Sequence, residues 1–234
     1  MKSLSFVRLI NTLLVVTSLA FGLSSCQKED SDNVNQDRIY ADYSLVYDKG
    51  ENKTFARAAF RFGNVTGTAL ELKAPSEVRF GSDAPTFVPG VNYYERSYPG
   101  LQNQITFTFK DINGKTFTNS ISALEPIEFP ASFTTLTKGT AYPLSWDGPV
   151  VRPGEFVDVT LDGAGPTDPI QSFLQLQAGA TSLTLDADRI GRVDNGAGRV
   201  AISRTRNGAL QQGTSAGGTL TSRYQGQSKT IIVQ

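Results

Sequence analysis

The chain has 234 residues, with 22 Lys and Arg residues against 22 Asp and Glu residues, no His, and one Cys. Hydrophobic residues make up 39% and charged residues 19% of this globular composition, and the length permits one large domain or two smaller ones. The zero net charge argues against non-specific binding of nucleic acid, which requires a basic surface. The lack of His excludes Ser-His-Asp and Cys-His catalysis, His-ligated zinc and a histidine pH switch.

Residues 1–25 have the pattern of a secretory signal peptide. Lys2 and Arg8 give a positive start, and the apolar segment 9–23 contains only a few polar residues. A membrane-spanning helix needs about 20 apolar residues, so this segment is too short to remain as an anchor. We therefore predict that residues 1–25 are cleaved from the mature protein.

The end of this segment, Leu23, Ser24, Ser25 and Cys26, resembles the lipobox of bacterial lipoproteins, in which an aliphatic residue and two small residues precede a cysteine. Small side chains at Ser24 and Ser25 let the signal peptidase approach the backbone. The resemblance implies a diacylglycerol on the Cys26 thiol and a further acyl chain on the new amino terminus; no other cofactor is expected. Several acyl chains would hold the protein on a membrane essentially permanently. The alternative is a buried core cysteine after an ordinary signal peptide.

Residues 26–37 are almost entirely polar, so after the lipidated Cys26 we predict a short flexible tether. Within it, Gln27, Lys28, Glu29 and Asp30 resemble the export signal of surface lipoproteins of the Bacteroidota, in which acidic residues follow a lysine. This resemblance favours display on the outer face of the outer membrane over the periplasmic face. The alternative is a charged, solubilising linker.

From residue 38 onward, hydrophobic and polar residues alternate with the period of β-strands. The Asn113-Gly114 pair favours a tight hairpin turn, because glycine readily adopts positive φ. The pattern indicates half-buried antiparallel sheets. In the first block, residues 38–126, strands are predicted at 39–47, 55–62, 69–72, 78–80, 93–98, 105–109 and 116–121.

Glu125-Pro126 and Phe129-Pro130 interrupt this alternation, and the domain boundary is predicted between residues 126 and 127. Short strands separated by turn residues in both blocks predict an all-β fold with two consecutive β-sandwich domains. In the second block, residues 127–234, strands are predicted at 155–161, 172–176, 181–185, 200–204, 219–224 and 230–233, with one helical turn within 186–193.

The second block resembles an immunoglobulin-like sandwich in which Leu144 and Trp146 face inward. The whole chain resembles two-domain lipoproteins of the Bacteroidota. These resemblances imply a fold and a location, but no activity.

The acidic residues of the second block form no convincing catalytic or metal site, so an enzyme is not expected. Asp158 belongs to a strand and is predicted to point to solvent rather than to form a glycosidase-like carboxylate pair with a neighbour. Asp186, Asp188 and Asp194 lack the spacing of an EF-hand calcium loop, so no bound metal is predicted.

Tyr94, Arg96 and Tyr98 are the candidate ligand contacts, because aromatic faces beside polar groups suit sugar stacking or protein binding. On a strand these three residues share one face, while Tyr93 and Glu95 share the other. Packing within the fold is therefore an alternative explanation for part of this cluster.

The sequence as a whole predicts a lipid-anchored protein of the outer membrane that acts as a non-catalytic binding or structural module. Its expected partners are the membrane itself, through the lipid, and a glycan or another envelope protein. The alternative function is a carbohydrate-binding accessory lipoprotein of a glycan-uptake system.

Overall fold

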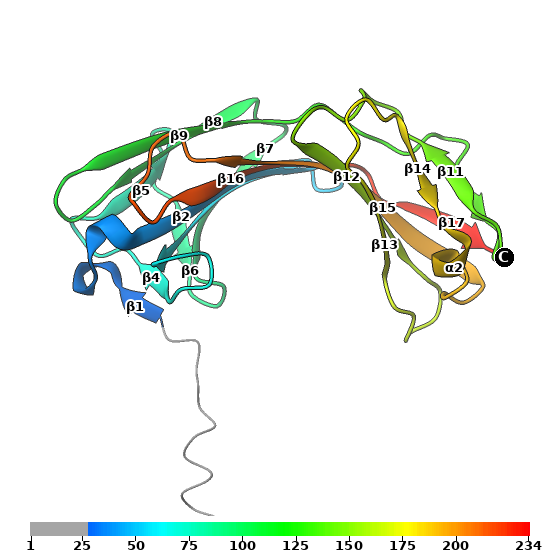
Figure 1. Cartoon of the computed structure of the whole chain (residues 1–234), viewed down its shortest axis with the longest axis horizontal. Helices are drawn as coiled ribbons and strands as arrows, with labels where there is room; N and C mark the ends of the chain where they lie inside the picture. Colours follow the sequence, from blue (N-terminus) through cyan, green and yellow to red (C-terminus); the bar gives the residue numbers. More distant parts are fainter. Residues whose placement is uncertain (1–27) are drawn as a thin grey trace, which may run out of the picture.

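The computed structural model describes residues 28–234, so the predicted signal peptide, the lipobox with Cys26, and Gln27 lie outside the described residues. The described chain forms two β-sandwiches side by side, which together make an arch (Figure 1). The predicted all-β fold with two sandwiches is confirmed. Between residues 28 and 234, no helix is long and apolar enough to cross a membrane.

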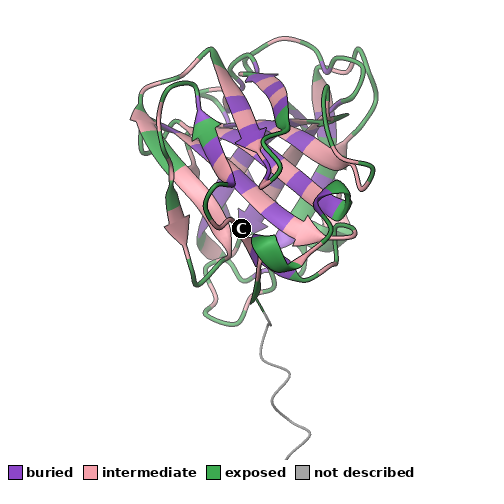
Figure 2. Cartoon of the chain, turned by 90° about the vertical axis from the view of Figure 1, so that its left-hand side faces the viewer, coloured by how far each residue is buried: buried purple, intermediate pink, exposed green. Residues whose placement is uncertain are grey.

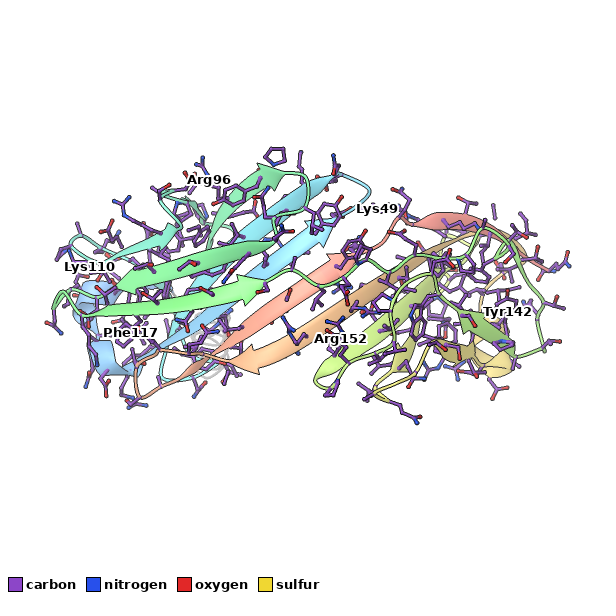
Figure 3. All side chains as sticks on the ribbon, turned by 90° about the horizontal axis from the view of Figure 1, so that it is seen from above. Lys49, Arg96, Lys110, Phe117, Tyr142 and Arg152 are labelled. Atoms are coloured by element: carbon purple, nitrogen blue, oxygen red, sulfur yellow. The ribbon has the colours of Figure 1, made fainter. Side chains whose placement is uncertain are left out.

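One sheet of twelve strands runs through both sandwiches. Its strands are β1 (Lys28–Asp30), β2 (Ile39–Asp48), β3 (Lys53–Phe62), β4 (Ala69–Glu71), β6 (Thr86–Val88), β7 (Tyr93–Pro99), β10 (Thr135–Leu136), β12 (Glu155–Asp162), β13 (Gln171–Gln175), β15 (Gly196–Ala209), β16 (Gly218–Gln225) and β17 (Lys229–Val233). The hydrogen-bonded order is β1-β4-β3-β2-β16-β15-β12-β13, with β7 and β6 beside β3, and β17 and β10 beside β15. Seen from above the arch, the long central strands run from one sandwich to the other (Figure 3).

Each sandwich has a second, smaller sheet on the convex side of the arch (Figure 1). The N-terminal sandwich is covered by β5 (Glu77–Phe80), β8 (Gln104–Lys110) and β9 (Thr116–Ser122), and the C-terminal sandwich by β11 (Tyr142–Ser145) and β14 (Ser182–Leu185). Within residues 28–234, three short helical turns accompany the sheets: η2 (Ser31–Asn33), η3 (Gln36–Arg38) and α2 (Ala187–Ile190). The predicted helical turn after residue 186 is confirmed, and Asp186 caps it by accepting the N–H of Arg189.

The core of the N-terminal sandwich is aromatic. Tyr43 of β2 meets Phe107 of β8 with 5.0 Å between ring centroids, and Phe60 of β3 meets Phe109 at 4.8 Å. Alternation along the strands buries every second side chain, as the sequence predicts, and Figure 2 shows the resulting stripes. Burial of these rings removes a large apolar area from water, which is the main source of stability for a chain segment without disulfides.

The core of the C-terminal sandwich is mostly aliphatic, with Val157, Val159 and Leu161 of β12 facing the small sheet. Leu144 and Trp146 face inward as predicted, and Trp146 satisfies its indole N–H by donating to the carbonyl of Pro149. The two cores therefore differ in composition although one sheet serves both.

The N-terminal sandwich is completed by residues from the far end of the chain. β16 pairs in parallel with β2, from Gly218 opposite Ala41 to Gln225 opposite Asp48. Leu220 of β16 is buried in the aromatic core. The twelve-stranded sheet thus crosses the predicted boundary at residue 126.

This crossing depends on β15, which extends well beyond the predicted strand at 200–204. β15 pairs with β17 over Gly196 to Val200 and with β16 from Ser203 to Ala209. The second half of β15 and its turn reach into the N-terminal sandwich. The pairing of β16 with β2, in contrast, joins strands far apart in sequence and leaves no local pattern, which is why the sequence does not reveal the crossing.

Residues 28–37 differ from the predicted flexible tether. Lys28–Asp30 forms β1 and pairs in parallel with β4. The hydroxyl of the buried Ser31 accepts the N–H of Lys73, and the side-chain amide of Gln36 donates to the carbonyl of Ser31 at 2.6 Å. A polar segment is ordered here because its polar groups find partners on the sandwich, a fact that composition cannot indicate.

Candidate binding surface

The outer face of the twelve-stranded sheet lies on the concave side of the arch, opposite the two small sheets (Figure 1). Directly paired residues project to the same side of a sheet, so the strand register shows which side chains share this face. Asp42 is opposite Thr219, and Ser203 is opposite both Asp158 and Gln225. The face therefore continues without a break from one sandwich to the other. We call it the concave face, defined by Tyr40, Asp42, Ser44, Val46, Phe55, Arg57, Arg61, Phe156, Asp158, Ser203, Thr205, Thr219, Thr221, Arg223 and Gln225.

A polar network occupies the centre of the concave face. The carboxylate of Asp158 accepts hydrogen bonds from the hydroxyl of Ser203 and, at 3.4 Å, from the guanidinium of Arg223. The Arg223 side chain is 40% exposed while Asp158 beneath it is 18% exposed. Asp158 points outward as predicted, but it serves to orient an exposed arginine rather than being an isolated surface charge.

Aromatic side chains lie on the part of the concave face that belongs to the N-terminal sandwich. The guanidinium of Arg57 lies 5.2 Å from the ring centre of Phe55 and 5.3 Å from that of Tyr93. Arg57 also donates to the carboxylate of Glu95. Cation–π contacts of this kind fix the rings and the guanidinium in one arrangement.

Several buried polar atoms of the concave face lack a hydrogen-bond partner among residues 28–234: Thr205 Oγ1, Arg61 Nε and Arg223 Nε. Thr205 is only 5% exposed. Buried polar atoms are nearly always hydrogen-bonded, so unsatisfied ones call for an explanation.

The structure places Tyr94 and Tyr98 on the opposite, inner face of the same sheet. Tyr94 is opposite the core residue Ala58, and its hydroxyl accepts the N–H of Leu72 at 2.8 Å. The hydroxyl of Tyr98 donates to the carbonyl of Phe80, and burial raises the pKa of both tyrosines to about 12. Both rings pack against the aromatic core.

Arg96 shares that face but lies at the rim of the N-terminal sandwich (Figure 3), where it forms an ion pair with Asp83 at 3.3 Å. The shared face of these three residues is as the alternation predicts. Their contacts support packing within the fold as the explanation for this cluster. The outward-facing residues could not be found from the sequence, because the strands of the concave face come from distant parts of the chain.

The acidic residues of the C-terminal sandwich have structural partners. Glu155 is buried beside Arg204, with 3.3 Å between carboxylate and guanidinium, and Asp168 accepts the N–H groups of Gly165 and Asp194. In the part of the chain that the structure describes, no three His, Cys, Asp or Glu residues are grouped as metal ligands would be.

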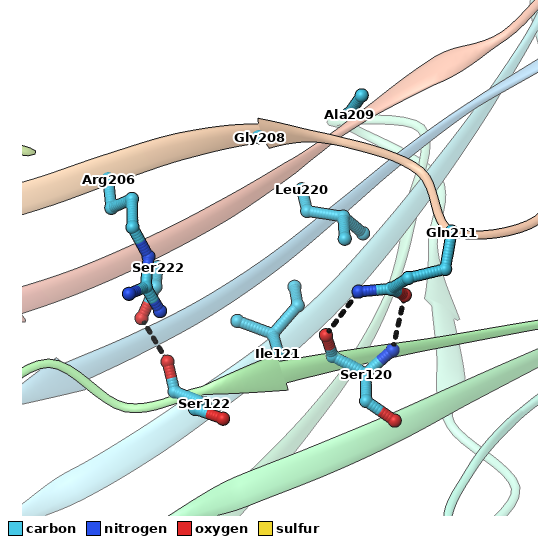
Figure 4. Close-up of a pocket in the computed structure, with 9 residues that line it drawn as sticks. All are labelled: Ser120, Ile121, Ser122, Arg206, Gly208, Ala209, Gln211, Leu220 and Ser222. Atoms are coloured by element: carbon cyan, nitrogen blue, oxygen red, sulfur yellow. Dashed lines mark hydrogen bonds between the residues drawn. The ribbon is translucent and has the colours of Figure 1, made fainter. Parts of the chain in front are cut away.

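A cleft of about 310 Å³ opens on the convex side, between β9 and the turn that joins β15 to β16 (Figure 4). The side chain of Gln211 accepts the N–H of Ser120 at 2.8 Å and donates to the carbonyl of the same residue at 3.1 Å. Gln212 accepts the N–H of Thr118. These amides take the place of a neighbouring strand on the free edge of β9, which protects that edge from pairing with another chain.

The chain matches no protein-family profile and no curated protein sequence. Among solved structures, it is similar to a tetra-tandem repeat from the extending region of a large adhesion protein, with 16% identity and a TM-score of 0.28. That match covers 82% of this chain and 50% of the other, so the chain spans half the length of that structure. A second similar structure is the two tandem V-type regions of VCBP3, a v-region-containing chitin binding protein, with 8% identity, a TM-score of 0.23, and coverage of 84% and 99%.

Proposed function

We propose that this protein is a lipid-anchored, non-catalytic binding module of the cell envelope, and that its ligand lies along the concave face. The observation that carries the binding role is the continuity of this face across both sandwiches, with exposed Arg223 oriented by Asp158. The lipid anchor rests on the sequence pattern that ends at Cys26. The proposed location is the outer membrane, with the outer face favoured.

The intact mass of the protein from its native membrane tests the anchor. A mature chain that begins at Cys26 and carries added acyl mass is expected, and Cys26→Ala should lose both the added mass and the membrane association. An unmodified, soluble chain would contradict the proposed anchor and location.

Protease added to intact cells tests which face of the outer membrane carries the protein. Digestion of the sandwiches in intact cells is expected, with a periplasmic protein protected in the same cells as the control. Protection of this protein as well would place it on the periplasmic face. In the described structure, Lys28 and Asp30 of the predicted export signal are paired with Glu71 and Lys73, so the signal would have to be read before β1 forms.

The alternative function is a carbohydrate-binding accessory lipoprotein of a glycan-uptake system. The arrangement of Phe55, Arg57 and Tyr93 favours it, because rings beside a charged donor suit a sugar face and its hydroxyls. Affinity electrophoresis through laminarin, xylan or glycogen tests this alternative. Retardation that is lost in Phe55→Ala/Tyr93→Ala would support it.

The inward-facing tyrosines provide the comparison for that experiment. Tyr98→Phe removes only a hydroxyl that bonds to the Phe80 carbonyl, so it should leave any retardation unchanged. If no polysaccharide retards the wild-type chain, the glycan alternative is excluded for these polymers, and an envelope protein becomes the partner to seek on the concave face.

A further inference from the structure

Ordered structure begins almost immediately after the predicted lipidation site. Lys28, two residues after Cys26, is hydrogen-bonded in register opposite Ala69 of β4. Its ammonium group forms an ion pair with Glu71 and lies 5.1 Å from the ring centre of Phe87. These contacts fix the position at which the chain leaves the N-terminal sandwich.

This short separation sets an upper limit on the distance between the sandwich and the lipid. An extended chain spans about 3.3–3.6 Å per residue, so Lys28 lies within about 7 Å of Cys26. We propose that the N-terminal sandwich docks directly on the lipid surface through the end that carries β1, instead of moving freely on a tether. This inference rests on the proposed acylation of Cys26, because the acyl chains would bring that residue to the bilayer interface.

The surface around Lys28 suits contact with lipid headgroups and the adjoining acyl region. Since β1 and β4 are parallel, their beginnings lie together, and the turn before β4 flanks Lys28. Val65 of that turn is 56% exposed. Val91, in the turn that follows β6, is 53% exposed, and Phe87 of β6 contacts Lys28. Exposed aliphatic side chains beside lysine are the combination that interfacial protein surfaces use.

Docking at this end brings only the part of the N-terminal sandwich that carries β1 to the membrane. β1 lies at the lower end of this sandwich in Figure 1, whereas β8, β9 and the cleft of Figure 4 lie on the convex side, away from that end. Val150 is also on the convex side: its carbonyl accepts from Arg204, which points into the C-terminal sandwich. Val150 is 42% exposed and thus gives a matched aliphatic control site far from β1.

The test uses the acylated full chain in phosphatidylcholine vesicles that contain a headgroup spin-labelled lipid. A fluorophore is attached to a single added cysteine in Val65→Cys or Val150→Cys, because the acylated Cys26 has no free thiol. Quenching about fivefold stronger at residue 65 than at residue 150 is expected, since only the first site would lie at the interface. A flexible Gly/Ser linker of about twelve residues inserted between Gln27 and Lys28 should reduce the quenching at residue 65 to the control level.

The outcomes separate docking from the anchor itself. Equal quenching at the two sites in a chain that floats with the vesicles overturns docking alone. If quenching at residue 65 stays strong after the linker is inserted, the short chain between Cys26 and Lys28 is not what holds the sandwich at the lipid. That result would also contradict the proposal. A chain that carries no acyl mass and does not float overturns the proposed function and docking together. The fluorophore at residue 65 could instead be shielded from water in the absence of lipid, to a degree that grows with protein concentration. That result would identify a second copy of the chain as the occupant of this surface and overturn the proposal.

Discussion

The two sandwiches share one sheet, yet they differ in how the chain builds them. The C-terminal sandwich takes its core from residues 124–233 apart from Tyr47, which packs against its border. The N-terminal sandwich takes strands from the first half of the chain and then needs β16, whose Leu220 fills its core. The difference indicates that the N-terminal sandwich depends on the C-terminal part of the chain, while the reverse dependence is weak.

The largest expected effect follows from separating the two parts. A fragment of residues 28–126 lacks β16, leaves the edge of β2 unpaired, and exposes the aromatic core, so it should not fold. A fragment of residues 123–234 retains nearly all of its own core and should fold. Far-UV circular dichroism and NMR signal dispersion distinguish the two, with residues 28–234 as the control. A dispersed spectrum from fragment 28–126 would show that the N-terminal sandwich is self-sufficient.

The C-terminal sandwich also contains a buried ion pair, whereas the N-terminal core is built from rings. The Arg204 side chain is fully buried beside Glu155 and donates to the carbonyls of Pro149 and Val150. Arg204→Met leaves a carboxylate buried without its partner and should lower the free energy of unfolding by about 3–5 kcal/mol.

The matched variant is Arg204→Met/Glu155→Met, which removes both charges and should recover most of that loss in a urea titration. A double variant as unstable as the single one would show that Arg204 stabilises the sandwich through its carbonyl contacts rather than through Glu155.

A smaller effect is expected where the two sandwiches meet. A Cβ added at Gly226, between β16 and β17, would lie 2.5 Å from the carbonyl oxygen of Ile127 and 3.0 Å from a methyl group of Ile202. Gly226→Ala should therefore destabilise the chain by about 1–3 kcal/mol. Gly208→Ala, in the neighbouring strand β15 and with open space around the added atom, is the control. Equal stability of both variants would show that the junction adapts.

The smallest effect concerns the ordered start of the N-terminal sandwich. The hydrogen bond from Lys28 lowers the pKa of Glu71 below its ordinary value of 4.5. Because the folded state favours the ionised form of Glu71, the contact with Lys28 stabilises the fold fully above pH 4.5. This stabilisation is lost as the pH falls through the lowered pKa. Hydrogen exchange at β1 should accelerate across that acidic range. Lys28→Met should weaken this pH dependence, with Lys73 accounting for the remainder; an unchanged profile would assign it to another carboxylate.

Much of the fold is predictable because it is local. Alternation along residues 39–47 and 55–62, the Asn113-Gly114 turn and the inward Leu144 and Trp146 all concern neighbouring residues, and the structure agrees with each. The parallel pairing of β2 with β16 joins residues such as Asp42 and Thr219, which are 177 positions apart, and no local pattern encodes it.

The candidate site was predictable only in part for the same reason. Alternation correctly separates Tyr94 and Tyr98 from Tyr93, but it cannot tell which face is the inner one. The concave face emerges only after Asp158, Ser203 and Arg223, from three strands, are brought together by the sheet. The order of residues 28–37 was likewise hidden, since it depends on partners such as Glu71 and Lys73.

Cross-linking of Ser44→Cys to Thr221→Cys in a Cys26→Ala chain tests most directly whether one sheet joins the two sandwiches. The two positions are opposite each other in β2 and β16 and project from the concave face. The account predicts near-complete linkage by a short bifunctional thiol reagent, and no linkage between Ser44→Cys and Thr160→Cys, which lies on β12 beyond β16 and β15. Absence of the first cross-link, with both thiols shown to be reactive, would contradict the shared sheet and with it the continuous binding face.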